Sequence, residues 1–156
     1  MATRNIDEFN EITGKVFALL YEAFPLPIGL RPTAIGIEEH EPGEYDPVSG
    51  KVSGRTPVTE EEIVFGHSVQ WLEEAGYLTS IRGQSQGYPR LYFAESRLTA
   101  KGLEVLNAMP DNLTKRESIG QQLAEASKSG GKELLRTITT EALGIGVQLG
   151  AKAFGL

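Results

Sequence analysis

Residues 69–78 read VQWLEEAGYL, and residues 97–106 read RLTAKGLEVL. The first segment is typical of the end of a helix, in which Gly76 takes the left-handed position after the last turn and lets the chain enter a strand without a Cβ clash. In the second segment, Leu98 is expected to close the core beneath a hairpin, and Thr99 to cap the helix that follows. Together they predict a helix, a β-hairpin and a second helix in succession.

The hairpin is predicted between these two segments. Residues 77–81 and 88–93 are rich in aromatic and branched side chains, and they flank a polar tip at 82–87 that is bounded by glycine. The helix before the hairpin is expected to begin at Thr59, because Thr59 and Glu62 match the S/T-x-x-E capping box. Its predicted buried face consists of Val64, Trp71, Leu72 and Ala75, with Ile63 and Phe65 flanking.

A first helix is predicted over residues 6–23, where apolar side chains recur every three or four positions. Asn5 and Glu8 are expected to form its cap, and the helix must stop before Pro25. Residues 25–58 are rich in glycine and proline and predict an irregular connection, with a short strand at 35–37 and a tight turn at 46–50. So long a connection within a compact domain is often functional.

The C-terminal part is predicted to be helical. A short helix follows Thr99, includes Met109 and ends at Pro110. Two further helices are expected, one over residues 114–128 and one from about Lys132, with a break at Gly130 and Gly131.

The two opening segments resemble the winged-helix superfamily. In that family a helix ends in a Leu-Glu-Glu-Ala-Gly-like phrase before the wing, and an L-T-x-x-G-x-x-x-L phrase follows the second wing strand. The resemblance covers residues 59–109, with 6–23 as the first helix. It implies an α+β fold with a winged-helix-like domain at 1–110, in which 25–58 is an irregular insertion, and a two-helix extension at 111–156.

Composition narrows the range of functions. The chain has 156 residues, a formal charge of −6, no cysteine and two histidines. Disulfides, thiolate chemistry and Cys-type zinc sites are therefore excluded. No phosphate-binding glycine loop, nucleophile elbow or paired-carboxylate arrangement is apparent. We expect a non-enzymatic protein with no cofactor, no metal site and no small-molecule substrate.

The location of the protein is also predicted from the sequence. The first 24 residues carry four acidic side chains, which is unlike a signal peptide. No uncharged apolar run reaches the roughly 18 to 20 residues that a spanning helix needs. We expect a cytoplasmic protein without a membrane span.

Winged-helix proteins include many DNA-binding regulators as well as protein-interaction modules. Here the helix after Thr59 carries three glutamates in its first turn, and no lysine or arginine occurs between Arg55 and Arg82. Such a helix opposes insertion into DNA, because affinity for a duplex comes largely from cations on phosphates. The wing is more permissive, and its candidate nucleic-acid contacts are Arg82, Gln84, Arg90, Arg97 and Lys101. The alternative is a solvated hairpin.

The last helix is a candidate for self-association. Gly146 and Gly150 are spaced i, i+4, and small residues at this spacing let helices approach closely. The candidate oligomerisation residues are Leu135, Ile138, Ala142, Ile145, Gly146, Leu149 and Gly150. The alternative is that this helix packs on its own domain. We therefore expect an interaction module that assembles with itself or with a larger complex through its C-terminal helices. The alternative is a dimeric DNA-binding transcriptional regulator that contacts DNA through the wing.

Overall fold

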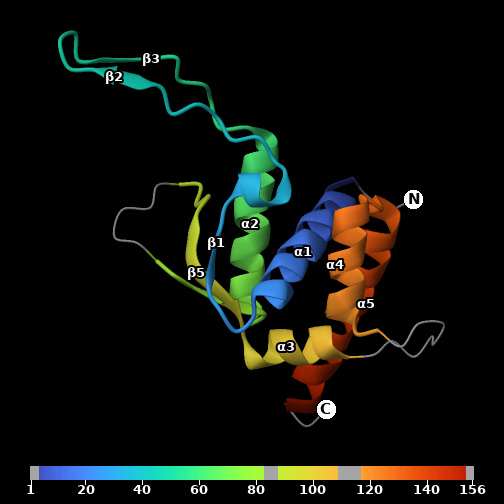
Figure 1. Ribbon diagram of the computed structural model, residues 1–156. Helices are drawn as coiled ribbons and strands as arrows, with labels where there is room; N and C mark the ends of the chain where they lie inside the picture. The colour runs from blue at the N-terminus through green and yellow to red at the C-terminus, as the bar shows by residue number, and fades with distance from the viewer. Residues whose placement is uncertain (1–3, 83–87, 109–116, 154–156) are drawn as a thin grey trace.

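The N-terminal helix α1 (Arg4–Ala23) forms the centre of the structure (Figure 1), a computed structural model that describes residues 4–82, 88–108 and 117–153. It begins two residues before the predicted start, so that Asn5 lies inside its first turn and does not cap it. Ile12, Val16 and Leu20 are buried on the expected face. Phe17 is buried as well, because α1 packs mainly against α2 (Glu60–Glu74), α4 (Ile119–Ser129) and α5 (Lys132–Ala153).

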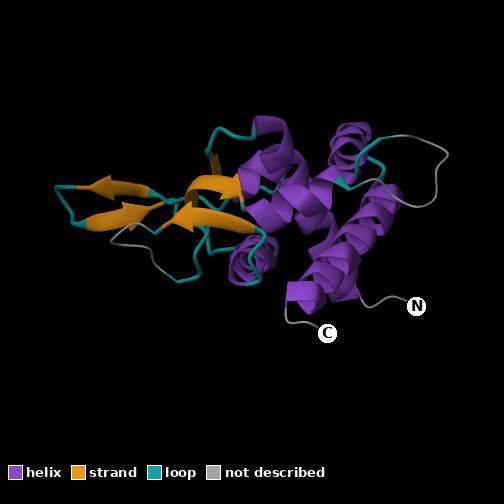
Figure 2. Ribbon diagram, turned by 90° about the horizontal axis from the view of Figure 1, so that it is seen from below, coloured by secondary structure: helices purple, strands orange, loops and turns teal. Residues whose placement is uncertain are grey.

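The chain has an α+β fold, as predicted. The remaining elements are β1 (Ile28–Leu30), the 3₁₀ helix η1 (Pro32–Ile35), β2 (Glu44–Asp46), β3 (Lys51–Ser53), β4 (Leu78–Ile81), β5 (Phe93–Leu98) and α3 (Ala100–Asn107). The strands gather toward one end of the molecule and most of the helices toward the other (Figure 2).

A three-stranded antiparallel sheet has the order β1–β5–β4. Leu78 of β4 lies opposite Leu98 of β5, and Ile28 of β1 lies opposite Ser96. The β1–β5 and β4–β5 pairings are both irregular near Glu95, which has a left-handed φ of 47°. The first strand of the predicted hairpin is confirmed as β4.

The second strand of the hairpin lies later in the chain than predicted. Residues 88–92 do not belong to the sheet, and β5 begins only at Phe93. Pro89 has no N–H to donate to a strand ladder. Arg90 turns toward α2, where its guanidinium lies 2.9 Å from a carboxylate oxygen of Glu73. The apolar segment thus packs beside α2, and the more polar segment that follows it pairs with β4.

The predicted short strand at 35–37 is wrong, because residues 32–35 form η1. Pro32 occupies its start, where the missing N–H costs nothing. Gly36 ends it in the left-handed conformation with a φ of 84°. The turn packs against α1 and α2.

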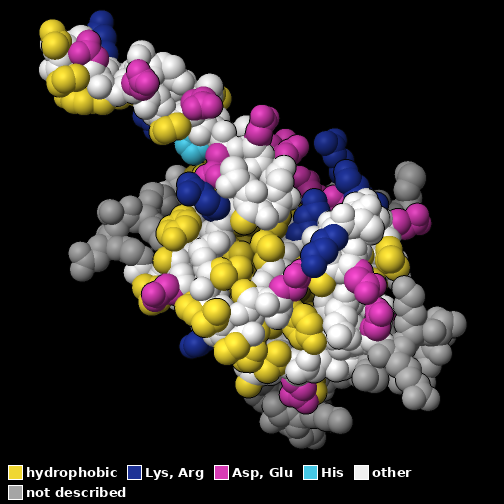
Figure 3. Space-filling view, in the orientation of Figure 1, with side chains coloured by type: hydrophobic (Ala, Val, Ile, Leu, Met, Phe, Trp, Pro, Cys, Tyr) yellow, Lys and Arg dark blue, Asp and Glu magenta, His cyan; other side chains and the backbone are white. Residues whose placement is uncertain are grey.

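Residues 41–56, which we call the arm, project from the body of the molecule (Figures 1 and 3). The predicted tight turn is present, since the amide of Gly50 donates to the carbonyl of Asp46 at 2.8 Å. Tyr45 of β2 lies opposite Val52 of β3, and all strand residues of the arm are exposed. The arm therefore adds nothing to the core.

The helices of the tail begin and end at local capping signals. α4 begins at Ile119, later than predicted, because Ser118 and Gln121 form a capping box. The break at Gly130 is confirmed by its φ of 73°. The expected helix end at Met109 and Pro110 lies outside the described residues, and α3 ends at Asn107.

One hydrophobic core joins the tail to the rest of the chain. Tail residues buried in this core are Ile119, Leu123, Ala126, Leu135, Ile138 and Ala142. The predicted boundary at residue 110 thus separates two stretches of sequence that share one core.

Candidate functional site

Helix α2 carries two apolar stripes with different surroundings. Phe65, Val69 and Leu72 are fully buried, and Phe65 packs against Phe93 of the sheet with ring centroids 6.3 Å apart. Trp71 was predicted to be buried, but 48% of its surface is exposed, as is 37% of Ile63. The first stripe is covered completely, with Phe65 on the sheet, whereas α1 lies beside the second stripe and leaves one side of it open.

The second stripe and the N-terminal half of α1 enclose an open apolar groove of about 530 Å³, which we call the α1/α2 groove. Trp71 lies within it and meets the Phe9 ring in a T-shaped arrangement with centroids 5.4 Å apart. The indole also stacks on Tyr77, with centroids 6.4 Å apart. The groove is lined by Asn5, Ile6, Phe9, Ile63, Val64, His67, Ser68 and Trp71.

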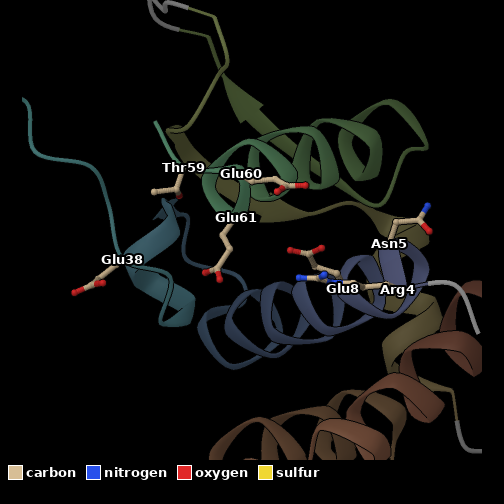
Figure 4. Close-up of a pocket in the computed structure, with 7 residues that line it drawn as sticks. All are labelled: Arg4, Asn5, Glu8, Glu38, Thr59, Glu60 and Glu61. Carbon is tan, nitrogen blue, oxygen red and sulfur yellow. The ribbon is translucent and has the colours of Figure 1, made fainter. Parts of the chain in front are cut away.

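A second cavity of about 660 Å³, shown in Figure 4, lies next to one end of the groove. Asn5 lines both cavities. Glu8 from α1 and Glu61 from α2 point into the space between the two helices. The lining includes four carboxylates, which we call the acidic end: Glu8, Glu38, Glu60 and Glu61. Arg4 is the one cation that lines this cavity, and within the described part of the chain none of the four carboxylates forms an ion pair.

Beside the acidic end, the buried carboxylate of Glu62 fixes the start of α2. It accepts hydrogen bonds from the Thr59 amide at 2.7 Å and from the His40 amide and ring Nδ1, both at 2.8 Å. Burial alone raises the pKa of the Glu62 carboxyl. The hydrogen bonds from Thr59 and His40 outweigh burial and lower this pKa to about 2. The predicted capping box is confirmed, and it also ties the base of the arm to α2.

The structure places Arg90 inside the protein, which is a correction to its predicted role in binding nucleic acid. Its surface is 8% exposed. The guanidinium contacts Glu73, donates to the Ser80 hydroxyl at 2.9 Å and lies 4.2 Å from the Phe93 ring centroid. Arg90 therefore holds residues 88–92 against α2, and its guanidinium is occupied by contacts within the chain.

The other predicted nucleic-acid contacts are dispersed. Lys101 donates to a carbonyl at the end of α2 and lies 4.5 Å from the Tyr77 ring centroid. Arg82 and Arg97 are exposed at different ends of the β4–β5 ladder. Gln84 lies outside the described residues. Among the described residues, Arg82 and Arg97 are thus two separate exposed arginines and do not form a joined patch.

The predicted oligomerisation face of α5 packs largely within its own chain. Leu135, Ile138, Ala142 and Gly146 are buried, while Ile145, Leu149 and Gly150 are half-buried. A Cβ added at Gly146 would lie 2.0 Å from the Tyr77 hydroxyl, so the close approach expected of this glycine occurs inside the monomer. Arg136 further ties α5 to α1 through Glu11.

The chemistry available in the groove is apolar contact and negative charge. His67 lies 3.3 Å from the Tyr88 hydroxyl, and the neighbouring Ser68 is 5% exposed.

Among residues 4–82, 88–108 and 117–153, no three His, Asp or Glu side chains are grouped to hold a metal ion. No helix in the same ranges is long and apolar enough to cross a membrane.

Comparisons of the chain with models of protein families, with curated proteins and with solved structures give no match.

Sequence reasoning missed the groove because it assigned Trp71 to the core. A signal was present in α2, where apolar residues occur on two sides of the helix. A helix with apolar residues on two sides either has both sides covered or leaves one open. The sequence of α2 alone does not say which.

Proposed function

We propose that this chain is a non-enzymatic, winged-helix-like interaction module whose α1/α2 groove docks another protein. The observation that carries the proposal is the half-exposed indole of Trp71 within an open apolar groove. Exposed apolar patches mark interaction sites, and tryptophan is enriched among the residues that dominate binding energy.

The order of the elements supports the winged-helix part of the proposal. A helix, a strand and a short helical turn are followed, after the β2–β3 arm, by a second helix and two antiparallel strands, and β1 lies beside β5. In DNA-binding members of the superfamily, the helix before the wing enters the major groove. In this chain the corresponding α2 offers an apolar stripe and carboxylates in place of cations, which favours a protein partner.

The groove replaces α5 as the docking surface in this proposal, since the face of α5 is already covered within the monomer. A cytoplasmic location is part of this proposal, because a chain without cysteine does not depend on an oxidising compartment for disulfides.

The test is selection of helical peptides that bind the full chain. Trp71 is the only tryptophan, so its fluorescence reports binding in the groove directly. We expect tryptophan-free peptides that bind the wild type and bind the Ile6→Glu/Ile63→Glu variant roughly tenfold or more weakly. Leu134→Glu is the matched control, because Leu134 is an exposed apolar residue of α5 outside the groove.

The DNA-binding alternative predicts a different outcome. Mixed-sequence duplex would bind, the affinity would fall as salt rises, and Arg82→Glu/Arg97→Glu would abolish it. That result, together with no peptide dependent on the groove, would overturn the proposal.

A further inference from the structure

The α1/α2 groove and the acidic end form one continuous surface. Glu60, Val64, His67 and Trp71 follow one another on α2 at intervals of four, three and four residues, which places them along a single side of the helix. Asn5 bridges the same two regions from α1. The surface is therefore apolar along most of its length and negative at one end.

We propose that the occupant of the groove is an amphipathic helix that places its apolar side in the groove and lysine or arginine side chains against the acidic end. This inference rests on the proposed function, because it names the partner of the same site.

The dimensions of the groove suit a helix of about three turns. The twelve residues from Glu60 to Trp71 are separated by eleven steps of 1.5 Å and span roughly 16 Å. A partner helix of that length presents apolar side chains at i, i+3 or i+4, and i+7, which is the pattern by which helices occupy grooves. The exposed parts of Ile6, Ile63 and Trp71 provide its apolar floor.

The charge of the acidic end determines which side chains the partner helix places there. Four carboxylates and one guanidinium line this end, and none of the four forms an ion pair among the described residues. Glu8 and Glu61 also border a smaller cavity that Lys15 and Lys132 line, so the excess of negative charge is largest on the side of Glu60. The dipole of α2 favours Glu60 and Glu61 at its N-terminus but leaves their charge facing the cavity. An ammonium or guanidinium group is attracted to this end, whereas a phosphate, an acidic lipid surface or an acidic peptide is repelled.

A second copy of the chain fits this surface less well. The arm offers an apolar pair, Tyr45 and Val52, to a neighbouring molecule. The arm carries three acidic residues against the two cations Lys51 and Arg55, so it brings no net positive charge to the acidic end. Charge complementarity therefore favours a basic helix from another protein.

The experiment uses three tryptophan-free helical peptides of about fourteen residues with one apolar stripe. They differ only at one end, which carries three lysines, three glutamines or three glutamates. Binding to the full chain is followed by Trp71 fluorescence. We expect the lysine peptide to bind most tightly and the glutamate peptide least, by roughly fivefold at each step at low salt, with smaller differences as salt rises.

Charge reversal on the protein sharpens the test. In Glu60→Lys/Glu61→Lys the order of the three peptides should invert, and in Glu60→Gln/Glu61→Gln the preference should shrink without inverting. The second variant keeps the test decisive if the first does not fold. Glu125→Lys, at an exposed position of α4, is the matched control and should leave the order unchanged.

The outcomes separate this inference from the proposed function. Equal binding of the three peptides, with no response to charge reversal, overturns the basic-helix partner and leaves groove docking intact. Failure of every peptide to bind overturns both. Light scattering that shows a dimer, lost in Ile6→Glu/Ile63→Glu, would assign the groove to a second copy and overturn the inference.

Discussion

Glu62 is the residue on which the start of α2 depends. Its carboxylate is completely buried, yet it remains charged because amide and ring N–H groups of Thr59 and His40 surround it. Removing such a group leaves buried donors without an acceptor, which costs more than the hydrogen bonds contribute on average. The same residue joins α2 to the chain that leads into the arm.

Acid should weaken the fold through Glu62. Because its pKa is lowered to about 2 in the folded state, from an ordinary value of 4.5, the contribution of Glu62 is fully present above pH 4.5 and is lost as the pH falls toward 2. We expect Glu62→Gln to lower the free energy of unfolding at pH 7 by about 1–3 kcal/mol and to flatten the pH dependence in that window.

Urea denaturation followed by circular dichroism at pH 7, 4.5 and 3 measures the effect of Glu62→Gln. The exposed Glu125→Gln is the control and should behave like the wild type. Equal loss of stability on acidification in wild type and Glu62→Gln would contradict the assignment.

At the scale of elements, two glycines of α5 have different surroundings. Gly146 faces Tyr77 at a distance that leaves no room for a Cβ, whereas Gly144 faces open space. Both lie in the helix interior, where glycine is unfavourable relative to alanine by roughly 0.5–1 kcal/mol. Only the packing differs.

Two alanine substitutions should therefore act in opposite directions. Gly146→Ala forces the Tyr77 ring away and is expected to lower the free energy of unfolding by about 1–3 kcal/mol. Gly144→Ala is expected to raise it by about 0.5–1 kcal/mol, since it only improves helix propensity. Thermal and urea denaturation of the two variants make the comparison, and stabilisation by both would show that α5 does not pack closely on Tyr77.

At the scale of the whole molecule, the two tail helices complete the core around α1. Leu123, Leu135 and Ile138 are buried against the rest of the chain. Each such side chain contributes about 1.5–3 kcal/mol when it is removed from water. The sum over the tail is comparable with the net stability of a typical domain, which is about 5–15 kcal/mol.

Truncation after residue 110 should thus abolish cooperative folding. We expect residues 1–110 to lose near-ultraviolet circular dichroism and to bind a hydrophobic dye, whereas the full chain unfolds in a single transition. A truncated protein that unfolds cooperatively, with stability within about 2 kcal/mol of the full chain, would show that the core closes without the tail.

Local signals in the sequence were sufficient for much of the secondary structure. The capping box at Thr59 and the glycine ends at Gly76 and Gly130 were predicted correctly, because each depends on groups a few residues apart. The α+β class and the existence of α1, α2, β4 and α5 followed from periodicity and turn residues. The winged-helix resemblance and the interaction function remain predictions.

What only the tertiary structure decided was which surface of each element is covered. β5 is shifted because Arg90 finds its partner on α2, Trp71 is half-exposed because α1 covers only one side of its stripe, and Gly146 meets Tyr77 of its own chain. These outcomes depend on contacts between residues far apart in the sequence, and periodicity within one helix or strand carries no information about them. The sequence by itself therefore determined the helix ends that carry a local signal, at Thr59, Gly76 and Gly130, while the packing of α1 against α2 determined that a groove exists.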